Sequence, residues 1–435
     1  MKHVLRAALW VPLFATVLLV QGCLKDHCSR TIRYKIYTPE YIPLSEARSM
    51  AGTLGPTPLV TTGKIFYHKG YLFIGEPNKG IHVIDDRDPS RPANIAFLRV
   101  PGNLDMAVSG EVLYADSYVD MLSFDLSDPS RPQLLGRTRD VFPVHRYGYG
   151  FTDDPAGRGV VTGFKVTDTL ISYACPVKSP GNSGGPEPYD VYYDGGDYVV
   201  SSSTATPPGI AAGKSVGGST SRFAVDGQYL YAVLNDSLRL YNISVPSHPV
   251  YDRSIPVDPE IQTIFCYRGY LYMGAGAGVA IFDNSRPASP VQVSTFQHIT
   301  ACDPVVVQNI TAYATIRSGA SCHITGSTNK LLVFSVYDPA SPRLAKEMEL
   351  TNPGGLAVAG DELIVTDGKG GIRFLDVSVP SNPHLVTTVK GPDSPSDVII
   401  LDSTVLVVAR DGLYQYHYKN GETPSLLSRL GVSGT

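Results

Sequence analysis

The segment Gly181-Asn-Ser-Gly-Gly-Pro186 is one residue away from the motif that carries the nucleophilic serine of chymotrypsin-like proteases. That chemistry requires a histidine base and a buried aspartate that orients the histidine. No fitting histidine motif accompanies Ser183, and the surrounding insertion is too short for the two barrels of that fold. Because short motifs often match by chance, we interpret Ser183 as a loop serine.

Asp190, Asp194 and Asp197 lie close together and would suit a calcium ion, but their spacing differs from that of the EF-hand loop. A solvated acidic loop explains them better. The histidines are scattered over turns and strand faces, where a solvated or hydrogen-bonded side chain is the usual state. No Ser-His-Asp set, histidine metal cluster or phosphate-binding loop emerges, so the sequence offers no clear catalytic centre.

The N-terminus has the composition of a signal peptide. A basic start, Lys2 to Arg6, precedes an apolar run from Ala7 to Val20 that is too short for a settled membrane span. Leu19-Val-Gln-Gly-Cys23 resembles a lipobox, in which Cys23 receives a diacylglyceryl group and becomes the mature N-terminus. Ordinary cleavage without lipidation is the alternative. We expect residues 1–22 to be a lipoprotein signal peptide, since multiple acyl chains give stable anchoring.

A turn of the form Asp-Pro-x-x-Pro, altered to different degrees, recurs along nearly the whole chain. The copies are Asp88–Pro92, Asp128–Pro132, Val245–Pro249, Arg286–Pro290, Asp338–Pro342, Val379–Pro383 and Asn420–Pro424. Their last prolines are 40, 117, 41, 52, 41 and 41 residues apart. Such a period is too long for one hairpin and too short for a domain, so it indicates stacked supersecondary units that share a core.

Each turn follows a β pattern that ends in Asp or a similar residue, as in Gly80–Asp85 and Gly371–Asp376. A side chain of this kind can accept a hydrogen bond from the backbone two residues on, and the prolines then stop the strand. A hairpin signal precedes each turn and one more strand follows it, which gives four strands per repeat. We therefore predict an all-β, seven-bladed β-propeller of four-stranded antiparallel blades, with eight blades as the alternative.

Two copies of the strand and turn carry a family resemblance. Phe374-Leu-Asp-Val-Ser-Val-Pro-Ser-Asn-Pro383 and Leu331-Leu-Val-Phe-Ser-Val-Tyr-Asp-Pro-Ala-Ser-Pro342 resemble the repeat of the bacterial LVIVD-repeat β-propeller lipoproteins. The resemblance spans roughly residues 57 to 432. It implies a propeller on a surface-facing bacterial lipoprotein, and it implies no catalytic activity because the family as a whole carries none that is agreed.

The rest of the chain is assigned around these repeats. Residues 23–56 are predicted to form a tether with a short helix, and residues 57–435 the propeller. The 117-residue interval predicts a long loop insertion at about residues 140–221, between blades two and three. The strand-like segments Ile32–Tyr37 and Val160–Val166 are expected to extend the edge of a blade.

Besides Cys23, five cysteines suit an oxidising compartment. Cys302 precedes the first strand of blade five and Cys322 lies in an enlarged loop after its second strand, so both are expected on the same face of the propeller. The residues around them also resemble a recurring pattern of the lipoprotein family. We predict a Cys302–Cys322 disulfide, and we expect Cys175 and Cys266 to be buried thiols.

Alignment of the repeats places charged residues at the starts of first strands and the ends of second strands, which border the same end of the central channel. This predicted binding face consists of Glu76, Asp105, Asp116, Arg222, Asp303, Arg317, Asp367, Asp397 and Arg410. An Asp at a strand start often only caps its turn. Crowded carboxylates, however, repel unless they pair with the arginines, a cation or a polar ligand. Replacing Asp105, Asp303 and Asp397 with Asn is expected to weaken binding and leave the fold intact.

A net charge of −4 without a basic stripe argues against a nucleic-acid partner. We predict a lipoprotein of the bacterial cell envelope, held in the outer membrane through its N-terminal lipid and exposed at the surface. It is expected to be a non-enzymatic binding module for a protein or glycan. The alternative is a metal-dependent propeller hydrolase of lactonase type, with its site at the channel mouth. We expect no cofactor, with a Ca²⁺ ion at the channel mouth as the alternative.

Overall fold

Seven antiparallel sheets, each built on four consecutive strands, make up most of the structure, a computed structural model; two further strands extend the sheet of blade 1 to six. It describes residues 29–147, 150–174, 215–234, 236–257, 261–275, 278–297, 304–317, 328–419 and 421–433. Blades 1 to 3 comprise β3 (Ile65–His68), β4 (Tyr71–Glu76), β5 (Gly80–Asp85), β6 (Ala93–Arg99); β7 (Met106–Ser109), β8 (Val112–Ser117), β9 (Asp120–Asp125), β10 (Gln133–Thr138); and β13 (Phe223–Asp226), β14 (Tyr229–Leu234), β15 (Ser237–Asn242), β16 (Val250–Pro256). Blades 4 and 5 comprise β17 (Thr263–Tyr267), β18 (Tyr270–Ala275), β19 (Gly278–Asp283), β20 (Val291–Gln297); and β21 (Val305–Gln308), β22 (Thr311–Ile316), β23 (Lys330–Ser335), β24 (Arg343–Glu349). Blades 6 and 7 comprise β25 (Leu356–Ala359), β26 (Glu362–Thr366), β27 (Ile372–Asp376), β28 (His384–Val389), with the 3₁₀ turn η3 (Gly368–Gly370); and β29 (Asp397–Leu401), β30 (Thr404–Ala409), β31 (Gly412–His417), β32 (Ser425–Gly431).

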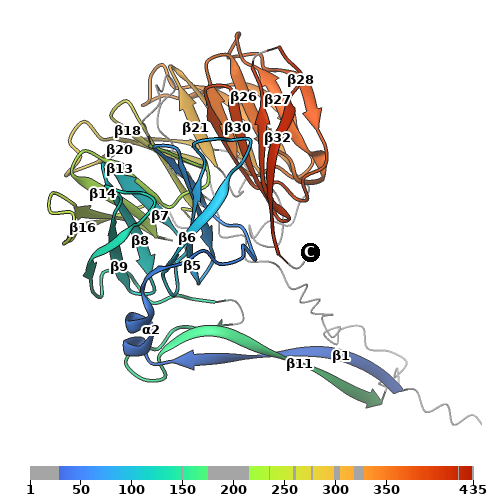
Figure 1. Ribbon diagram of the computed structural model, residues 1–435. Helices are drawn as coiled ribbons and strands as arrows, with labels where there is room; N and C mark the ends of the chain where they lie inside the picture. The colour runs from blue at the N-terminus through green and yellow to red at the C-terminus, as the bar shows by residue number, and fades with distance from the viewer. Residues whose placement is uncertain are drawn as a thin grey trace, which may run out of the picture. The chain divides into compact units, whose positions relative to one another are not determined.

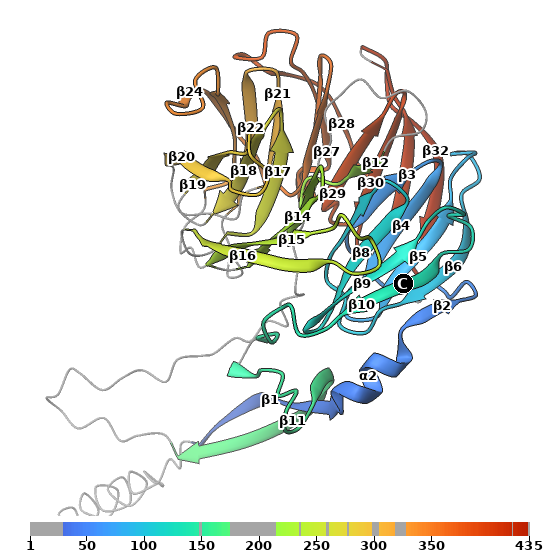
Figure 2. The same ribbon diagram turned by 90° about the vertical axis from the view of Figure 1, so that its left-hand side faces the viewer.

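The blades stand around a central channel, so the predicted seven-bladed β-propeller is confirmed (Figures 1 and 2). Within each blade the strands follow one another in chain order, and from blade 1 to blade 7 the first strand of each blade contacts the first strand of the next. The first strands therefore line the channel and the fourth strands form the rim. The described residues contain no eighth four-stranded sheet.

The recurring turns work as the sequence predicts. Asp125 Oδ1 accepts a hydrogen bond from Ser127 N (2.8 Å), and Asp376 Oδ1 accepts one from Ser378 N (2.7 Å). The turns also join neighbouring blades, because hydroxyl groups of fourth strands donate to proline carbonyls in the next turn. Ser428 Oγ, for example, donates to Pro89 O (2.6 Å), which links blade 7 to blade 1.

Each fourth strand carries a β-bulge at the same position, two residues after its start. The bulged residue of blade 6, for example, is Val386, between Leu385 and Thr387. A bulge interrupts the row of free backbone groups on an edge strand and so discourages pairing with another chain. The rim of the propeller is thereby protected at every blade.

The ring closes without exchange of a strand, because blade 7 and blade 1 are each built from consecutive strands. Apolar side chains of the two blades, including Ile74, Ile399 and Leu406, form one buried cluster. At this seam Gln415 Nε2 donates to Asp86 Oδ1 (2.5 Å), and both side chains are buried. Among the described residues, Asp86 Oδ2 and Gln415 Oε1 have no hydrogen-bond partner. A proton on Asp86 Oδ2 would let the two groups form a pair of reciprocal hydrogen bonds.

Stability should therefore depend on the protonation of Asp86. Burial raises the pKa of Asp86 to about 6, above its value in an unfolded chain. The folded state then holds a proton that the unfolded state has released, so the free energy of unfolding falls as pH rises from about 4 to 6. Asp86→Asn, which imitates the protonated acid, should raise stability at pH 8 by about 3 kcal/mol. Denaturant titrations of both proteins at pH 5 and pH 8 measure this, and an equal effect of the substitution at the two pH values would contradict it.

The N-terminal part and the insertion differ from the prediction. Ile32–Tyr37 and Val160–Val166 do not extend a blade edge; they lie in β1 (Ser29–Ile42) and β11 (Val160–Ala174), which pair with each other. The predicted short helix is α2 (Leu44–Met50). The outer edge of blade 1 is covered instead by β2 (Gly52–Leu54), which pairs with β6.

The chain divides into two compact units, Met1–Glu40 with Gly163–Gly195, and Tyr41–Thr162 with Gly196–Thr435. The first contains most of the two-stranded β1–β11 ribbon, and the second contains the propeller. No helix in the described ranges is long and apolar enough to cross a membrane. The predicted boundaries at residues 22 and 56 remain predictions.

Candidate functional site

The end of the insertion enters the central channel. β12 (Ser215–Gly217) pairs antiparallel with β3 and becomes the innermost strand of blade 1 (Figure 2). Gly217 to Ser221, which we call the plug segment, is buried throughout. The chain continues from there into β13 of blade 3. The sequence analysis predicted this stretch as part of a long loop insertion at about residues 140–221, whereas the structure forms β12 here and buries the plug segment.

The plug segment contacts the first strands of several blades. Gly218 N donates to Ile65 O of blade 1 (3.1 Å). Ser219 Oγ accepts a hydrogen bond from Leu356 N of blade 6 (2.6 Å), and Ile264 N of blade 4 donates to Ser221 O (3.0 Å). Because these partners come from blades 1, 4 and 6, the segment crosses the channel at this level.

Asp397, at the start of β29 in blade 7, fixes the plug segment. Its Oδ1 accepts hydrogen bonds from Ser219 N (3.0 Å), Ser219 Oγ (3.2 Å) and its neighbour Val398 N (2.9 Å). Its Oδ2 accepts one from Thr220 Oγ1 (2.7 Å). A Cβ atom on Gly218 would overlap the Asp397 carboxylate, so the plug requires glycine there. Burial raises the pKa of Asp397.

Lys64, directly before β3 in blade 1, bonds to the same plug residue as Asp397, Thr220. It is 6% exposed, and its Nζ donates to Thr220 O (3.0 Å). Burial lowers the pKa of Lys64, and Asp105 and Asp397 act against that effect. Thr220 therefore connects a carboxylate of blade 7 to an ammonium of blade 1, at the seam that lacks strand exchange. The sequence analysis missed Lys64, although it precedes its first strand just as Asp105 and Arg222 do.

Asp105 and Asp116 of blade 2 complete the cluster with Arg222. Asp105 Oδ2 accepts a hydrogen bond from Arg222 N (2.5 Å). Asp116 Oδ1 accepts hydrogen bonds from Asn103 Nδ2, Leu104 N and Asp105 N, each 2.8 Å. Burial raises the pKa of Asp116 to about 7, and it also raises the pKa of Asp105. Four of the nine predicted residues, Asp105, Asp116, Arg222 and Asp397, thus belong to one buried charge cluster.

Glu76 and Asp367 lie at the predicted strand ends but serve local structure. Glu76 Oε2 is 2.8 Å from His82 Nε2, and both side chains are buried. Asp367 Oδ1 accepts hydrogen bonds from Thr351 N (2.7 Å) and Asn352 N (2.8 Å), and its Oδ2 pairs with Arg373 (2.6 Å). Both carboxylates are turned to the chain itself and not to the solvent.

The two remaining arginines are more accessible. Arg410 follows β30, is 58% exposed and pairs with Asp393 (3.0 Å). Arg317 follows β22 and is partly buried, which lowers its pKa. Asp303, the ninth predicted residue, lies outside the described residues.

Several other predicted features also lie outside the described residues: Cys23, Cys175, Ser183, Asp190, Asp194, Asp197, Cys302 and Cys322. Cys266 is a free, partly buried thiol, and burial raises its pKa to about 12. Within the described ranges, no group of three or more His, Cys, Asp or Glu side chains could hold a metal ion. The Ca²⁺ ion at the channel mouth remains a prediction.

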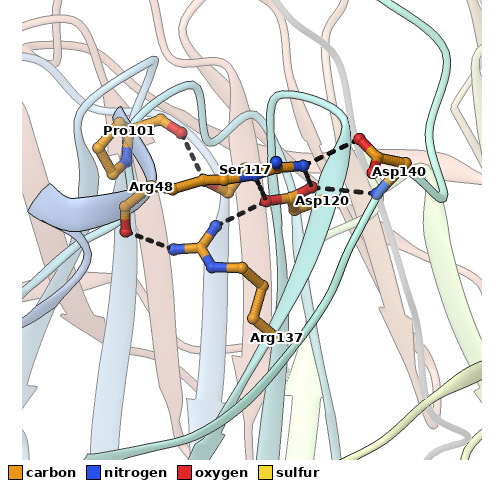
Figure 3. A network of polar contacts seen from close by, with 6 residues as sticks. All are labelled: Arg48, Pro101, Ser117, Asp120, Arg137 and Asp140. Carbon is orange, nitrogen blue, oxygen red and sulfur yellow. Dashed lines mark hydrogen bonds and ion pairs between the residues drawn. The ribbon is translucent and has the colours of Figure 1, made fainter. Parts of the chain in front are cut away.

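A second polar network joins α2 to blade 2 (Figure 3). Asp120, which is fully buried, accepts two hydrogen bonds from Arg48 (2.8 and 2.7 Å) and one from Arg137 (2.8 Å). Arg137 Nη2 also donates to Arg48 O (2.8 Å), and Asp140 accepts a hydrogen bond from Arg48 (2.9 Å). No sequence pattern indicates this network, because Arg48 and Asp120 are far apart in the chain.

Comparison with known proteins agrees with this geometry. The chain is a β-propeller. The family model of the LVIVD repeat matches residues 104–140, 217–255 and 353–390, which fall on blades 2, 3 and 6. The protein is therefore a seven-bladed propeller that carries LVIVD repeats. No curated protein matches it by sequence.

Solved structures of other propellers are similar in fold. One is a periplasmic gluconolactonase of Pseudomonas aeruginosa, with 11% identity over 88% of this chain and 96% of that chain and a TM-score of 0.52. Another is a protein from Lactobacillus plantarum, with 12% identity over 85% and 96% of the chains and a TM-score of 0.53. A third is the Neurospora crassa Pan2 WD40 domain, with 9% identity over 86% and 98% and a TM-score of 0.52. At such identities the likeness shows the fold alone.

Proposed function

We propose that the protein is a lipoprotein of the bacterial cell envelope, anchored through acyl chains on Cys23, in which the propeller binds a protein or glycan partner without catalysis. The lipobox-like segment before Cys23 supports the anchor. A rigid ring of seven blades supports the binding role, because binding loops on a rigid scaffold are held in place at low entropic cost.

One observation carries the choice of binding over hydrolysis. The plug segment occupies the channel between the first strands, and the carboxylates there already accept hydrogen bonds from the chain. A hydrolase at the channel mouth needs an open concave site with free polar groups that converge on a substrate. Asp105, Asp116 and Asp397 are at most 8% exposed and do not offer such groups.

The surface left for a partner is the mouth face, which we define as the face that carries the starts of first strands and the ends of second strands. Arg410 is exposed there, and the buried charge cluster lies beneath the same face. The opposite face carries the recurring turns. An accessible arginine at a rim can pair with a carboxylate of a protein or an acidic glycan.

The proposal predicts that a partner can be captured from the mouth face. A photo-crosslinking amino acid at position 410 should give a specific adduct in intact cells, since that position borders the expected interface. The matched position is Arg343, an exposed arginine that begins β24 beside the turn of blade 5. Adducts are identified by mass spectrometry. An adduct from position 343 and none from position 410 would place the interface on the other face, and no adduct from either would contradict a binding role.

A further inference from the structure

The β1–β11 ribbon is a two-stranded sheet with no third strand among the described residues. Its strands are long, 14 and 15 residues. Isolated two-stranded ribbons are only marginally stable in water. A ribbon of this length therefore gains most if another surface covers it.

The ribbon exposes large apolar side chains. Leu170 is 63% exposed, Ile36 50%, Val166 49% and Ile171 41%. Val166 and Leu170, four residues apart in β11, point to the same face of the ribbon, whereas Ile171 points to the other face. Exposed large apolar side chains on one face mark a site of contact. Ser172 Oγ lies 2.8 Å from Thr31 Oγ1, so the end of β11 lies beside the start of β1. The most exposed apolar residue, Leu170, is therefore close to the point where the chain enters the ribbon.

The ribbon is also basic, although the whole chain has a net charge of −4. The two strands contain the cations Arg30, Arg33, Lys35 and Lys165 and the anions Glu40 and Asp168, so their net charge is +2. The side chains of Arg33, Lys35 and Lys165 are exposed. Basic side chains next to exposed apolar ones fit the interface of a bilayer with anionic lipids.

The position of Cys23 favours a membrane as the surface that covers the ribbon. Ser29, the first residue of β1, follows Cys23 by six residues. A fully extended chain of that length spans about 20 Å at most. If Cys23 holds the acyl chains, the basic and apolar start of the ribbon cannot leave the neighbourhood of the headgroups, and its effective concentration at the membrane is high.

We propose that the β1–β11 ribbon is a membrane-contacting arm that binds the surface of a bilayer containing anionic lipids through one face, which carries Leu170, Val166, Arg33 and Lys35. The proposal rests on the proposed anchor at Cys23, but it concerns a separate surface and is tested separately. The arm gives the anchored protein a second attachment, so the acyl chains do not carry the whole contact.

The chain has a single tryptophan, Trp10. In a Trp10→Phe background, Leu170→Trp places one fluorescent reporter on the arm, and Val291→Trp, at a position that is also 63% exposed, places one on the rim of blade 4. The purified full-length protein is incorporated into phosphatidylcholine vesicles with or without phosphatidylglycerol and with brominated acyl chains. We expect quenching and a blue shift for Leu170→Trp in anionic vesicles and none for Val291→Trp. Arg33→Gln with Lys35→Gln should reduce the quenching to the control level, because each basic residue contributes about fivefold to binding.

The mass of the N-terminal peptide of the same sample shows whether Cys23 is acylated. If it is acylated and Leu170→Trp is not quenched, the arm proposal is wrong and the anchor stands. If it is not acylated, the anchor fails, and quenching by added anionic vesicles still supports the arm while its absence overturns it. A blue shift without vesicles, together with a dimer in sedimentation, would show that a second copy covers the ribbon and would also overturn the proposal.

Discussion

Asp397→Asn should lower the free energy of unfolding by about 3 kcal/mol, the cost of weakening a buried, hydrogen-bonded charge while its cationic neighbour stays buried. Asp397 is 3% exposed and accepts hydrogen bonds from Ser219 and Thr220 of the plug segment. An asparagine presents an N–H₂ group to one of these donors, and Lys64 loses a compensating charge. Urea denaturation measures the loss.

The control for this substitution is Asp402→Asn in the same blade. Asp402 is exposed and has a φ of 41°, a conformation that asparagine also adopts readily. We expect a change below about 0.5 kcal/mol there. Equal effects at positions 397 and 402 would show that the plug segment does not depend on the buried carboxylate.

Asp120→Ala should lower the free energy of unfolding by about 4 kcal/mol, because it leaves two arginines beside a buried cavity without a negative charge. Asp120 is 0% exposed and contacts both Arg48 of α2 and Arg137 of β10. The segment around α2 is expected to become sensitive to proteases, since Arg48 would lose its main partner on blade 2. Urea denaturation and limited proteolysis measure the two effects.

A matched control and a double substitution make the Asp120 prediction sharper. Asp140 also pairs with Arg48, but its side chain is 70% exposed and its φ is 57°, which asparagine tolerates, so Asp140→Asn should lower the free energy of unfolding by less than about 1 kcal/mol. In an Arg48→Leu, Arg137→Leu background, Asp120→Ala should cost far less than in the original protein. An unchanged cost in that background would mean that the ion pairs contribute nothing to the effect.

The fold could be predicted because its repeats are local. Every Asp-Pro-x-x-Pro turn lies within a few residues of the strand it ends, and hydrogen bonds such as Ser127 N to Asp125 Oδ1 follow from that spacing. Seven copies of the turn, with four strands per repeat, then predict seven blades. The same reasoning located Asp105, Arg222 and Asp397 at one end of the channel, because equivalent positions of repeats form a ring.

The role of these charges could not be predicted in the same way. The sequence suggested that Asp105 and Asp397 face a ligand and could be replaced without loss of the fold, whereas both are buried and hold neighbouring segments. The plug segment was the missing part. Gly218 and Ser219 precede the first strand of blade 3, and their partner Asp397 lies far along the chain, so only the folded structure brings them together.

The β1–β11 ribbon illustrates the same limit. Alternation of apolar and polar residues identified both strands, but it cannot say which strand pairs with which. The sequence placed them on a blade edge, and the structure pairs them with each other and covers the edge of blade 1 with β2. Pairing over such separations depends on the whole fold.

The central claim is that the chain closes its own channel, so that the propeller works by binding at its surface. Hydrogen–deuterium exchange of the native protein tests it most directly, through the amides of Gly218 and Ser219, which donate to Ile65 O and Asp397 Oδ1. The account predicts that these amides exchange as slowly as those of β29 and that Asp397→Asn accelerates them selectively. Exchange of the native segment at the rate of an unstructured peptide would show that the channel is open and would contradict the account.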